Sequence, residues 1–172
     1  ALCGGRVRIE DISIASMQGD IGFVDVLEKM GCNVVRGDDY IEVSGPDRLQ
    51  GIDVDMREIS DTSLTLAAIA PFAAGPVHIR NIEHTRWQET DRLKAMATEL
   101  DRLGVDVTEH KDGVSINPSA IRPAAIDTYE DHRVAMAFAL IGLKTPGIRI
   151  NDPACVNKTF PTFFKTLETL RR

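Results

Sequence analysis

The feature that most constrains the fold of this chain is a pattern that returns about every 70 residues. An alternating stretch at 7–12, Val-Arg-Ile-Glu-Asp-Ile, has close counterparts at 77–82 and 148–153. Alternation of apolar and polar residues predicts a strand, and residues with helical apolar spacing follow each stretch. Self-similarity of this kind indicates like units that bury their apolar faces together. We expect two full units and the start of a third, whose missing strands lie elsewhere in a longer chain.

Each full unit begins with the same succession of elements. An amphipathic helix is predicted at 20–30 and another at 89–103. They end at Gly31 and Gly104, which are suited to helix C-caps. A third helix is predicted at 161–170, where the opening proline is tolerated in a first turn.

Two short strands separated by turn-forming residues follow each of the first two helices. They are predicted at 33–35 and 40–43 in the first unit, and at 105–107 and 114–116 in the second. This succession indicates mixed α and β structure.

Each full unit also contains a helix of a second kind. The segments 63–74 and 134–143 are apolar on nearly every side and rich in alanine. A helix that is apolar all round is buried on all sides, so we expect these two helices inside and the sheets around them. Pro71 should kink the first of them or end it early.

Charged residues recur near the predicted helix starts. The stretch 87–92, Trp-Gln-Glu-Thr-Asp-Arg, opens the helix at 89–103, and Arg133 and Lys158 stand near two other starts. Helix N-termini attract anions, so three cations there indicate that several helices face one anion-binding cleft. Asp61 and Asp131 open the two buried helices at corresponding places in the repeat.

A plainer interpretation stays open for each cation. Arg92 would pair with Glu89 or a neighbouring acid on the helix surface. Arg133 would pair with Asp131 or Glu130, and Lys158 would be solvated.

Composition limits the partners of the chain. Its 172 residues are 27% charged with a net charge of −6, which gives no reason to expect a nucleic-acid partner. No apolar run approaches the roughly 18 residues of a membrane span, and we expect no signal peptide. Cys3, Cys32 and Cys155 form no CxxC or metal-binding spacing, which fits a reducing compartment, and we expect a cytoplasmic protein.

Four motifs together resemble the C-terminal half of the EPSP synthase family, the 3-phosphoshikimate 1-carboxyvinyltransferases. They are Met-Gln-Gly-Asp at 17–20, Glu-Thr-Asp-Arg at 89–92, Asp-His-Arg-Val-Ala-Met at 131–136 and Lys-Thr-Phe-Pro at 158–161. The resemblance implies an α/β (α+β) fold of repeated βαβαββ units, an inside-out α/β barrel with buried central helices. It further implies that residues 1–172 are a single C-terminal domain that lacks its N-terminal partner domain.

The resemblance also implies a reaction. The family transfers the enolpyruvyl group of phosphoenolpyruvate to the 5-hydroxyl of shikimate 3-phosphate and releases phosphate, in the pathway to the aromatic amino acids. It uses no metal and no organic cofactor. Its active site lies between two domains, and half a cleft cannot surround two substrates. We therefore predict that these 172 residues alone are inactive.

The resemblance assigns roles to five residues. Asp61 corresponds to the aspartate that takes the proton of the substrate hydroxyl, although a helix cap is the alternative for it. Glu89 corresponds to the glutamate that shuttles a proton at the methylene carbon of phosphoenolpyruvate. Arg92 and Arg133 correspond to arginines that bind this substrate through paired donors, and Lys158 to the lysine that closes on it.

Further positions are less defined. His132 lies between site residues, where its imidazole would transfer protons or make a structural hydrogen bond. Gln88 stands where the family has a lysine that contacts shikimate 3-phosphate, and His84 stands where many members have asparagine. Arg86 is a candidate to replace the missing charge.

Two other functions remain open at this stage. One is the related enolpyruvyl transfer to UDP-N-acetylglucosamine, against which the Glu-Thr-Asp-Arg motif argues. The other is a non-catalytic binding module with the same fold.

Overall fold

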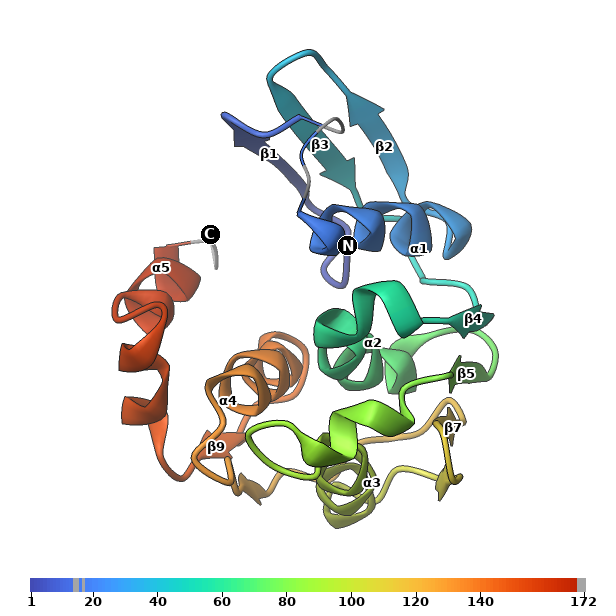
Figure 1. Cartoon of the computed structure of the whole chain (residues 1–172), viewed down its shortest axis with the longest axis vertical. Helices are drawn as coiled ribbons and strands as arrows, with labels where there is room; N and C mark the ends of the chain where they lie inside the picture. The colour runs from blue at the N-terminus through green and yellow to red at the C-terminus, as the bar shows by residue number, and fades with distance from the viewer. Residues whose placement is uncertain (14–15, 17, 170–172) are drawn as a thin grey trace.

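The computed structural model describes residues 1–13, 16 and 18–169 and consists of sheets arranged around interior helices (Figure 1). The first sheet contains β1 (Arg6–Glu10), β2 (Asn33–Arg36) and β3 (Tyr40–Ser44) in the order β1-β3-β2. Both pairings are antiparallel, and Val7 lies opposite Val43. The strands predicted in the first unit are thus confirmed.

The second sheet has four strands and joins the two full units. It contains β4 (Ile52–Asp55), β5 (Val77–Arg80), β6 (Val107–Glu109) and β7 (Val114–Ile116). Their order is β4-β5-β7-β6, with β4 parallel to β5 and the other pairs antiparallel. The last strand of the first unit therefore completes the sheet of the second.

The third sheet is a short parallel pair, β8 (Ala125–Ile126) and β9 (Arg149–Ile150). The predicted strand at 148–153 is too long, because only Arg149 and Ile150 pair with the neighbouring strand, opposite Ala125 and Ile126. The repeat is still visible. Asn151 donates to Asp127 at 2.5 Å across this pair, as Asn81 does to Asp55 at 2.5 Å across β4 and β5.

Two amphipathic helices follow the first strands of the full units. The first is a 3-10 turn, Gly19–Gly22, continued by α1 (Phe23–Lys29). The second is α3 (Arg92–Arg102), which begins three residues later than predicted. The Asp91 side chain accepts the N–H of Lys94 at 2.9 Å, so this aspartate is the N-cap and the residues before it are outside the helix.

The ends of these helices agree with the sequence-based prediction. Gly31 has a φ of +96° and Gly104 a φ of +78°, the left-handed backbone of a glycine C-cap. The last helix, α5 (Phe163–Thr169), carries no buried side chain. Met17 of the 17–20 motif and Leu170 of the predicted helix at 161–170 lie outside the described residues.

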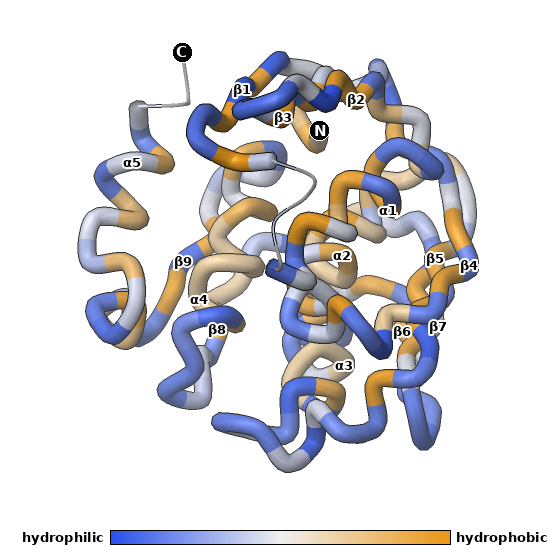
Figure 2. The backbone as a smooth tube through the Cα atoms, turned by 45° about the horizontal axis from the view of Figure 1, so that its top comes forward, coloured by the Kyte–Doolittle hydropathy of each residue, from blue (hydrophilic) through white to orange (hydrophobic). Residues whose placement is uncertain are grey.

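The two apolar helices lie inside, as predicted. Most side chains of α2 (Ser63–Ile69) and α4 (His132–Ala139) are buried, and their apolar tubes lie within a more polar exterior (Figure 2). Each continues into a 3-10 turn, Ala70–Phe72 or Leu140–Leu143. Pro71 lies in the first of these turns, so it ends α2 early as expected. No helix in the described part of the chain is both long and apolar enough to span a membrane.

Two predicted helix starts need correction. Asp61 lies in a 3-10 helix, Arg57–Thr62, which precedes α2 and has a non-helical residue inside it. Lys158 is the last residue of the 3-10 helix Pro153–Lys158, so it stands at the end of a helical turn and not at the start of α5. Asp131 does open α4, as its N-cap.

Candidate active site

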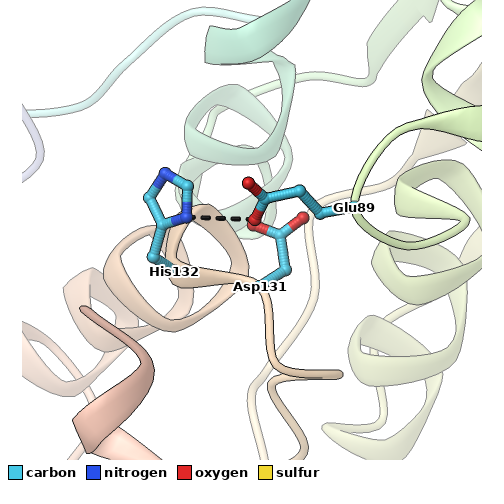
Figure 3. A group of neighbouring side chains, drawn as sticks. All are labelled: Glu89, Asp131 and His132. Atoms are coloured by element: carbon cyan, nitrogen blue, oxygen red, sulfur yellow. Dashed lines mark hydrogen bonds and ion pairs between the residues drawn. The ribbon is translucent and has the colours of Figure 1, made fainter. Parts of the chain in front are cut away.

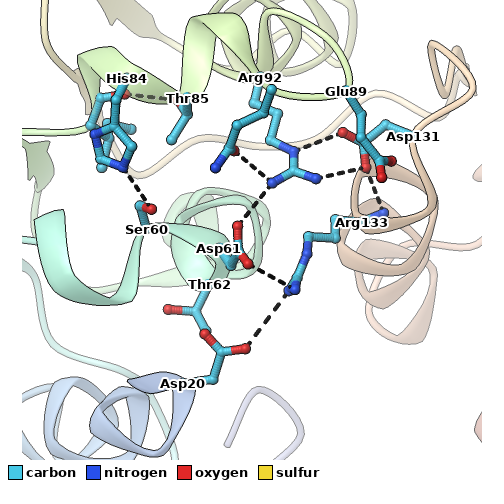
Figure 4. Close-up of polar contacts among 12 residues, drawn as sticks. Asp20, Ser60, Asp61, Thr62, His84, Thr85, Glu89, Arg92, Asp131 and Arg133 are labelled. Atoms are coloured by element: carbon cyan, nitrogen blue, oxygen red, sulfur yellow. Dashed lines mark hydrogen bonds and ion pairs between the residues drawn. The ribbon is translucent and has the colours of Figure 1, made fainter. Parts of the chain in front are cut away.

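Asp61 lies between two arginines from the other unit (Figure 4). Its Oδ1 accepts Nη1 of Arg92 at 2.9 Å, and its Oδ2 lies 2.8 Å from Nη2 of Arg133. The side chain keeps 35% of its surface exposed and borders a hollow of about 360 Å³ that Gln88 and Asp20 also line. Asp61 is therefore a paired carboxylate that solvent and small molecules can still reach.

Arg92 is the buried centre of the cluster. Its side chain is only 4% exposed, and Nε donates to Oδ2 of Asp131 at 2.7 Å. Nη1 also donates to Oε1 of Gln88 at 2.6 Å. A cation in the first turn of a helix is unfavourable unless anions join it, and Asp61 and Asp131 are those anions. The alternative pairing of Arg92 with Glu89 is wrong, because its carboxylate partners come from the segments before α2 and α4.

Asp131 holds Arg92 and caps α4 at once. Its side chain is fully buried, and its Oδ1 accepts the backbone N–H of Arg133 at 2.8 Å. The guanidinium of Arg133 turns away to Asp61 and, at 3.8 Å, to Asp20. The alternative that this guanidinium pairs with Asp131 or Glu130 is therefore wrong. Asp131 therefore positions two arginines, Arg92 through its guanidinium and Arg133 through its backbone N–H.

Glu89 joins two further groups (Figure 3). Its Oε2 lies 3.1 Å from Nδ1 of His132, and Lys158 binds its Oε1. The Lys158 ammonium, with further attraction from His132 and Arg92, holds the pKa of the Glu89 carboxyl below its usual value. Lys158 is thus paired and not merely solvated, and Glu89 is ionised at neutral pH.

The segment before Glu89 places the remaining predicted residues. It begins with a 3-10 helix, Glu83–Trp87, in which Nε2 of His84 lies 2.9 Å from Oγ of Ser60. Arg86 does not replace the charge that a lysine at position 88 would supply. Its guanidinium bonds Asp91 and Glu109 and so faces the turn between β6 and β7.

One group of ligand atoms has the spacing of a metal site. Single donor atoms of Glu89, Asp131 and His132 lie within 4.8 Å of one another (Figure 3). The carboxylates of this group are already bound by Lys158 and Arg92, which neutralise them as a metal ion would.

The structure brings all the predicted site residues together from distant parts of the chain. Bonds link Asp61 directly with Arg92 and Arg133 near the starts of α2, α3 and α4, and Arg92 with Gln88, while His84 bonds Ser60 beside Asp61 (Figure 4). Lys158 and His132 bond Glu89, which lies beside Asp131. Sequence reasoning missed the bond between Asp131 and Arg92. The repeat carried a signal, since Asp131 stands at the place of Asp61, but it did not reveal which arginine each aspartate would meet.

Comparison with known proteins gives a consistent result. The family model described as EPSP synthase (3-phosphoshikimate 1-carboxyvinyltransferase) matches residues 1–167. A 3-phosphoshikimate 1-carboxyvinyltransferase of Trichormus variabilis is 60% identical over 164 residues, which are 95% of this chain and 38% of that protein. One of a Marinomonas species is 47% identical and covers 99% of this chain and 40% of that protein. The chain thus spans about two fifths of the length of these relatives.

Solved structures share the fold. An EPSP synthase of Acinetobacter baumannii superposes with a TM-score of 0.84 at 27% identity, over 96% of this chain and 42% of that one. The enolpyruvyl transferase NikO of Streptomyces tendae superposes with a TM-score of 0.75 at 22% identity, over 98% of this chain and 41% of that one. At 22% identity the second likeness shows the fold alone.

Proposed function

This chain belongs to the EPSP synthase family, and on that premise we propose that it forms the C-terminal domain of a 3-phosphoshikimate 1-carboxyvinyltransferase. The whole enzyme would transfer the enolpyruvyl group of phosphoenolpyruvate to the 5-hydroxyl of shikimate 3-phosphate and release phosphate. The observation that carries the proposal is the contact network in which a reachable carboxylate, Asp61, lies between two guanidinium groups.

Asp61 is proposed as the base for the acceptor hydroxyl. A general base must be ionised and within hydrogen-bond reach of its proton. The partly exposed Asp61 carboxylate borders a hollow from which an acceptor hydroxyl can approach it. Its bonds to Arg92 and Arg133 fix the direction in which its oxygens point.

Arg133 is proposed to hold phosphoenolpyruvate. Its guanidinium is about one-third exposed and already has carboxylate partners. A phosphate or carboxylate group offers the same paired acceptors and would compete for these donors. When the substrate takes Arg133, the Asp61 carboxylate loses one of its two arginine partners and has an oxygen free to accept the hydrogen bond of the acceptor hydroxyl. Substrate binding would thus prepare the proton acceptor.

Glu89 and Lys158 are proposed to act as a second pair of this kind. Lys158 is the main cause of the lowered pKa of Glu89. If the lysine moves to the substrate, the pKa of Glu89 rises, and the carboxyl can take a proton and deliver it to the methylene carbon. His132 would keep the Glu89 side chain in place. Addition followed by elimination needs only such proton transfers, so no cofactor is proposed.

The charge of the network indicates why a second domain is needed. Four carboxylates and three cations leave a net charge of −1 when His132 is neutral. Two anionic substrates would be repelled by such a surface unless further cations face it. We propose that residues 1–172 are a single domain and that a partner domain supplies those cations. The charged members are Asp20, Asp61, Glu89, Asp131, Arg92, Arg133 and Lys158.

The same proposal covers location and partners. The three cysteines, Cys3, Cys32 and Cys155, are all free, which fits a reducing, cytoplasmic compartment. The net charge of −6 gives no support for a nucleic-acid ligand. The proposed partners are the two substrates and the second domain.

The test is phosphate release by the full-length enzyme and by the isolated 172-residue chain. We expect release from phosphoenolpyruvate only with shikimate 3-phosphate, and no turnover by the isolated chain. For the Asp61→Asn variant of the full-length enzyme, the matched control is Asp53→Asn. This change breaks an exposed pair with Arg80 and should leave the rate unchanged. If the full-length enzyme releases phosphate only with UDP-N-acetylglucosamine, or releases none, the proposed function is overturned.

A further inference from the structure

A strained turn leads directly into the site. Tyr129 and Glu130 have φ angles of +56° and +58°, so two consecutive residues with side chains adopt the left-handed conformation. Each such residue costs about 1–2 kcal/mol, which the surrounding structure must offset. The turn closes with a hydrogen bond from the N–H of Asp131 to the carbonyl of Thr128 at 2.9 Å. Because Asp131 and Arg133 follow at once, any change in the turn moves both residues.

A fully buried carboxylate, Glu99, holds this turn. Its Oε1 accepts the hydroxyl of Tyr129 at 2.6 Å, and its Oε2 accepts the backbone N–H of Asp127 at 3.2 Å. Arg102 lies 3.4 Å from the same carboxylate and 2.7 Å from that of Asp127. Burial and the Glu99 carboxylate raise the pKa of Tyr129 to about 12, so its hydroxyl stays protonated and donates.

One helix connects Glu99 with the network. Arg92 and Glu99 are seven residues apart on α3, which is close to two full turns, so both side chains lie on the same face. Arg92 bonds Asp131 after the turn, whereas Glu99 bonds Asp127 before the turn and Tyr129 within it. The rigid helix therefore fixes the turn at two points.

The first unit provides a contrast. The segment before α2 is a 3-10 helix, and none of its residues has a positive φ. Glu28 on α1 bonds Arg36 at the surface instead, at 2.8 Å, with half of its side chain exposed. Glu28 serves as a matched control. It is a glutamate on α1, the helix that corresponds to α3, and it pairs with an arginine but lies away from the site.

We propose that Glu99 is a positioning residue, which sets the place of Asp131 and Arg133 through Tyr129 and the left-handed turn. The inference rests on the proposed function for its kinetic consequence. If the turn relaxes, the guanidinium of Arg133 loses its position against phosphoenolpyruvate, whereas Asp61 stays in its own segment.

The kinetic test uses the full-length enzyme with Tyr129→Phe, Glu99→Gln and Glu99→Ala. We expect KM for phosphoenolpyruvate to rise about tenfold in Glu99→Ala. The rise should be smaller in Glu99→Gln, because Gln still accepts the tyrosine hydroxyl, and in Tyr129→Phe, because Glu99 still accepts the backbone N–H of Asp127. KM for shikimate 3-phosphate should stay within about twofold. Glu28→Ala should change neither. A variant that only lost stability would lower kcat per milligram and leave both KM values unchanged, and that result would overturn the proposal.

A second readout does not depend on catalysis. Amide hydrogen exchange of residues 128–133 should be faster in Tyr129→Phe and Glu99→Ala than in the wild type and in Glu28→Ala. Equal exchange in all four proteins would refute the positioning role even if the enzyme is active. Faster exchange together with a wild type that transfers no enolpyruvyl group would refute the proposed function alone.

Discussion

Asp61 and Asp131 stand at corresponding places in a repeated fold and are used in opposite ways. Each precedes a buried helix, and each binds Arg92. Asp61 keeps 35% of its side chain exposed at a hollow, whereas Asp131 has 0% exposed and caps α4. The repeat thus produced two aspartates, of which one can meet a ligand and the other can only hold its neighbours.

The difference arises in the residues just before each aspartate. A 3-10 helix leads to Asp61 and leaves it in the turn before α2. The left-handed residues Tyr129 and Glu130 precede Asp131 and place it as the buried N-cap of α4. Equivalent sequence positions therefore acquire different environments from the local backbone, and the environment decides which carboxylate is available for chemistry.

The largest effect is expected for Asp131→Ala. The change leaves the Arg92 charge buried with one partner fewer and removes the cap of α4, so unfolding free energy should fall by roughly 3–5 kcal/mol. Urea unfolding of the full-length enzyme measures it. A loss below about 1 kcal/mol would mean that the bond of Asp131 to Arg92 and its cap on α4 contribute little to stability.

Asp61→Asn should affect catalysis strongly and stability weakly, the opposite of Asp131→Ala. We expect kcat to fall by about a hundred- to ten-thousandfold, since the proton acceptor is lost, with unfolding free energy within about 1 kcal/mol of the wild type. Steady-state phosphate release and urea unfolding measure the two quantities on one preparation. An unchanged kcat would remove the proposed base and with it the contrast between the two aspartates.

A pH effect is expected at Glu89, next to the Asp131 anchor. Its folded-state pKa is below the unfolded value, so its contribution to stability is present above about pH 4.3 and is lost as pH falls through the folded-state pKa. Lys158→Met should raise the pKa of Glu89, which carbon-detected NMR of the carboxyl can follow. Lys165→Met on α5 is the control, and an equal titration in both variants would contradict the pairing.

The smallest expected effect is the change in unfolding free energy on substitution by glycine, which should have opposite signs in the turns before Asp61 and Asp131. Glu130→Gly relieves a left-handed conformation at an exposed site and should stabilise the protein by about 1 kcal/mol or less. Ser60→Gly, at the corresponding place, loosens a helical residue and its bond to His84, and should destabilise it by about 0.5–1 kcal/mol. The same sign for both, in thermal unfolding, would show that the turns do not differ in strain.

Much of the fold followed from the sequence, because periodicity reports which residues share a face. The buried helices, the glycine caps and the early end at Pro71 were all predicted. Burial in the sheets was not, since it depends on neighbouring strands. Val77 lies between β4 and β7 and is 0% exposed, whereas Val7, its counterpart in the repeat, lies on an edge strand and is 47% exposed.

The residues that gather at the candidate site were named from the sequence, but the bonds between them were not. The family resemblance names Arg92 and Asp61, but their bond depends on how α2 and α3 pack. Glu99 gave no signal, because a glutamate on an amphipathic helix ordinarily faces solvent. Only the packed structure reveals that it faces the turn before α4.

The most direct test is a crystal structure of the full-length enzyme with shikimate 3-phosphate and phosphoenolpyruvate bound. We predict that the Asp61 carboxylate lies within hydrogen-bond distance of the 5-hydroxyl and that Arg133 has moved from Asp61 to an anionic group of the substrate. The bond between Arg92 and Asp131 should be unchanged from 2.7 Å. A complex in which Asp61 still binds Arg133 and Asp131 has turned to the substrate would contradict this prediction.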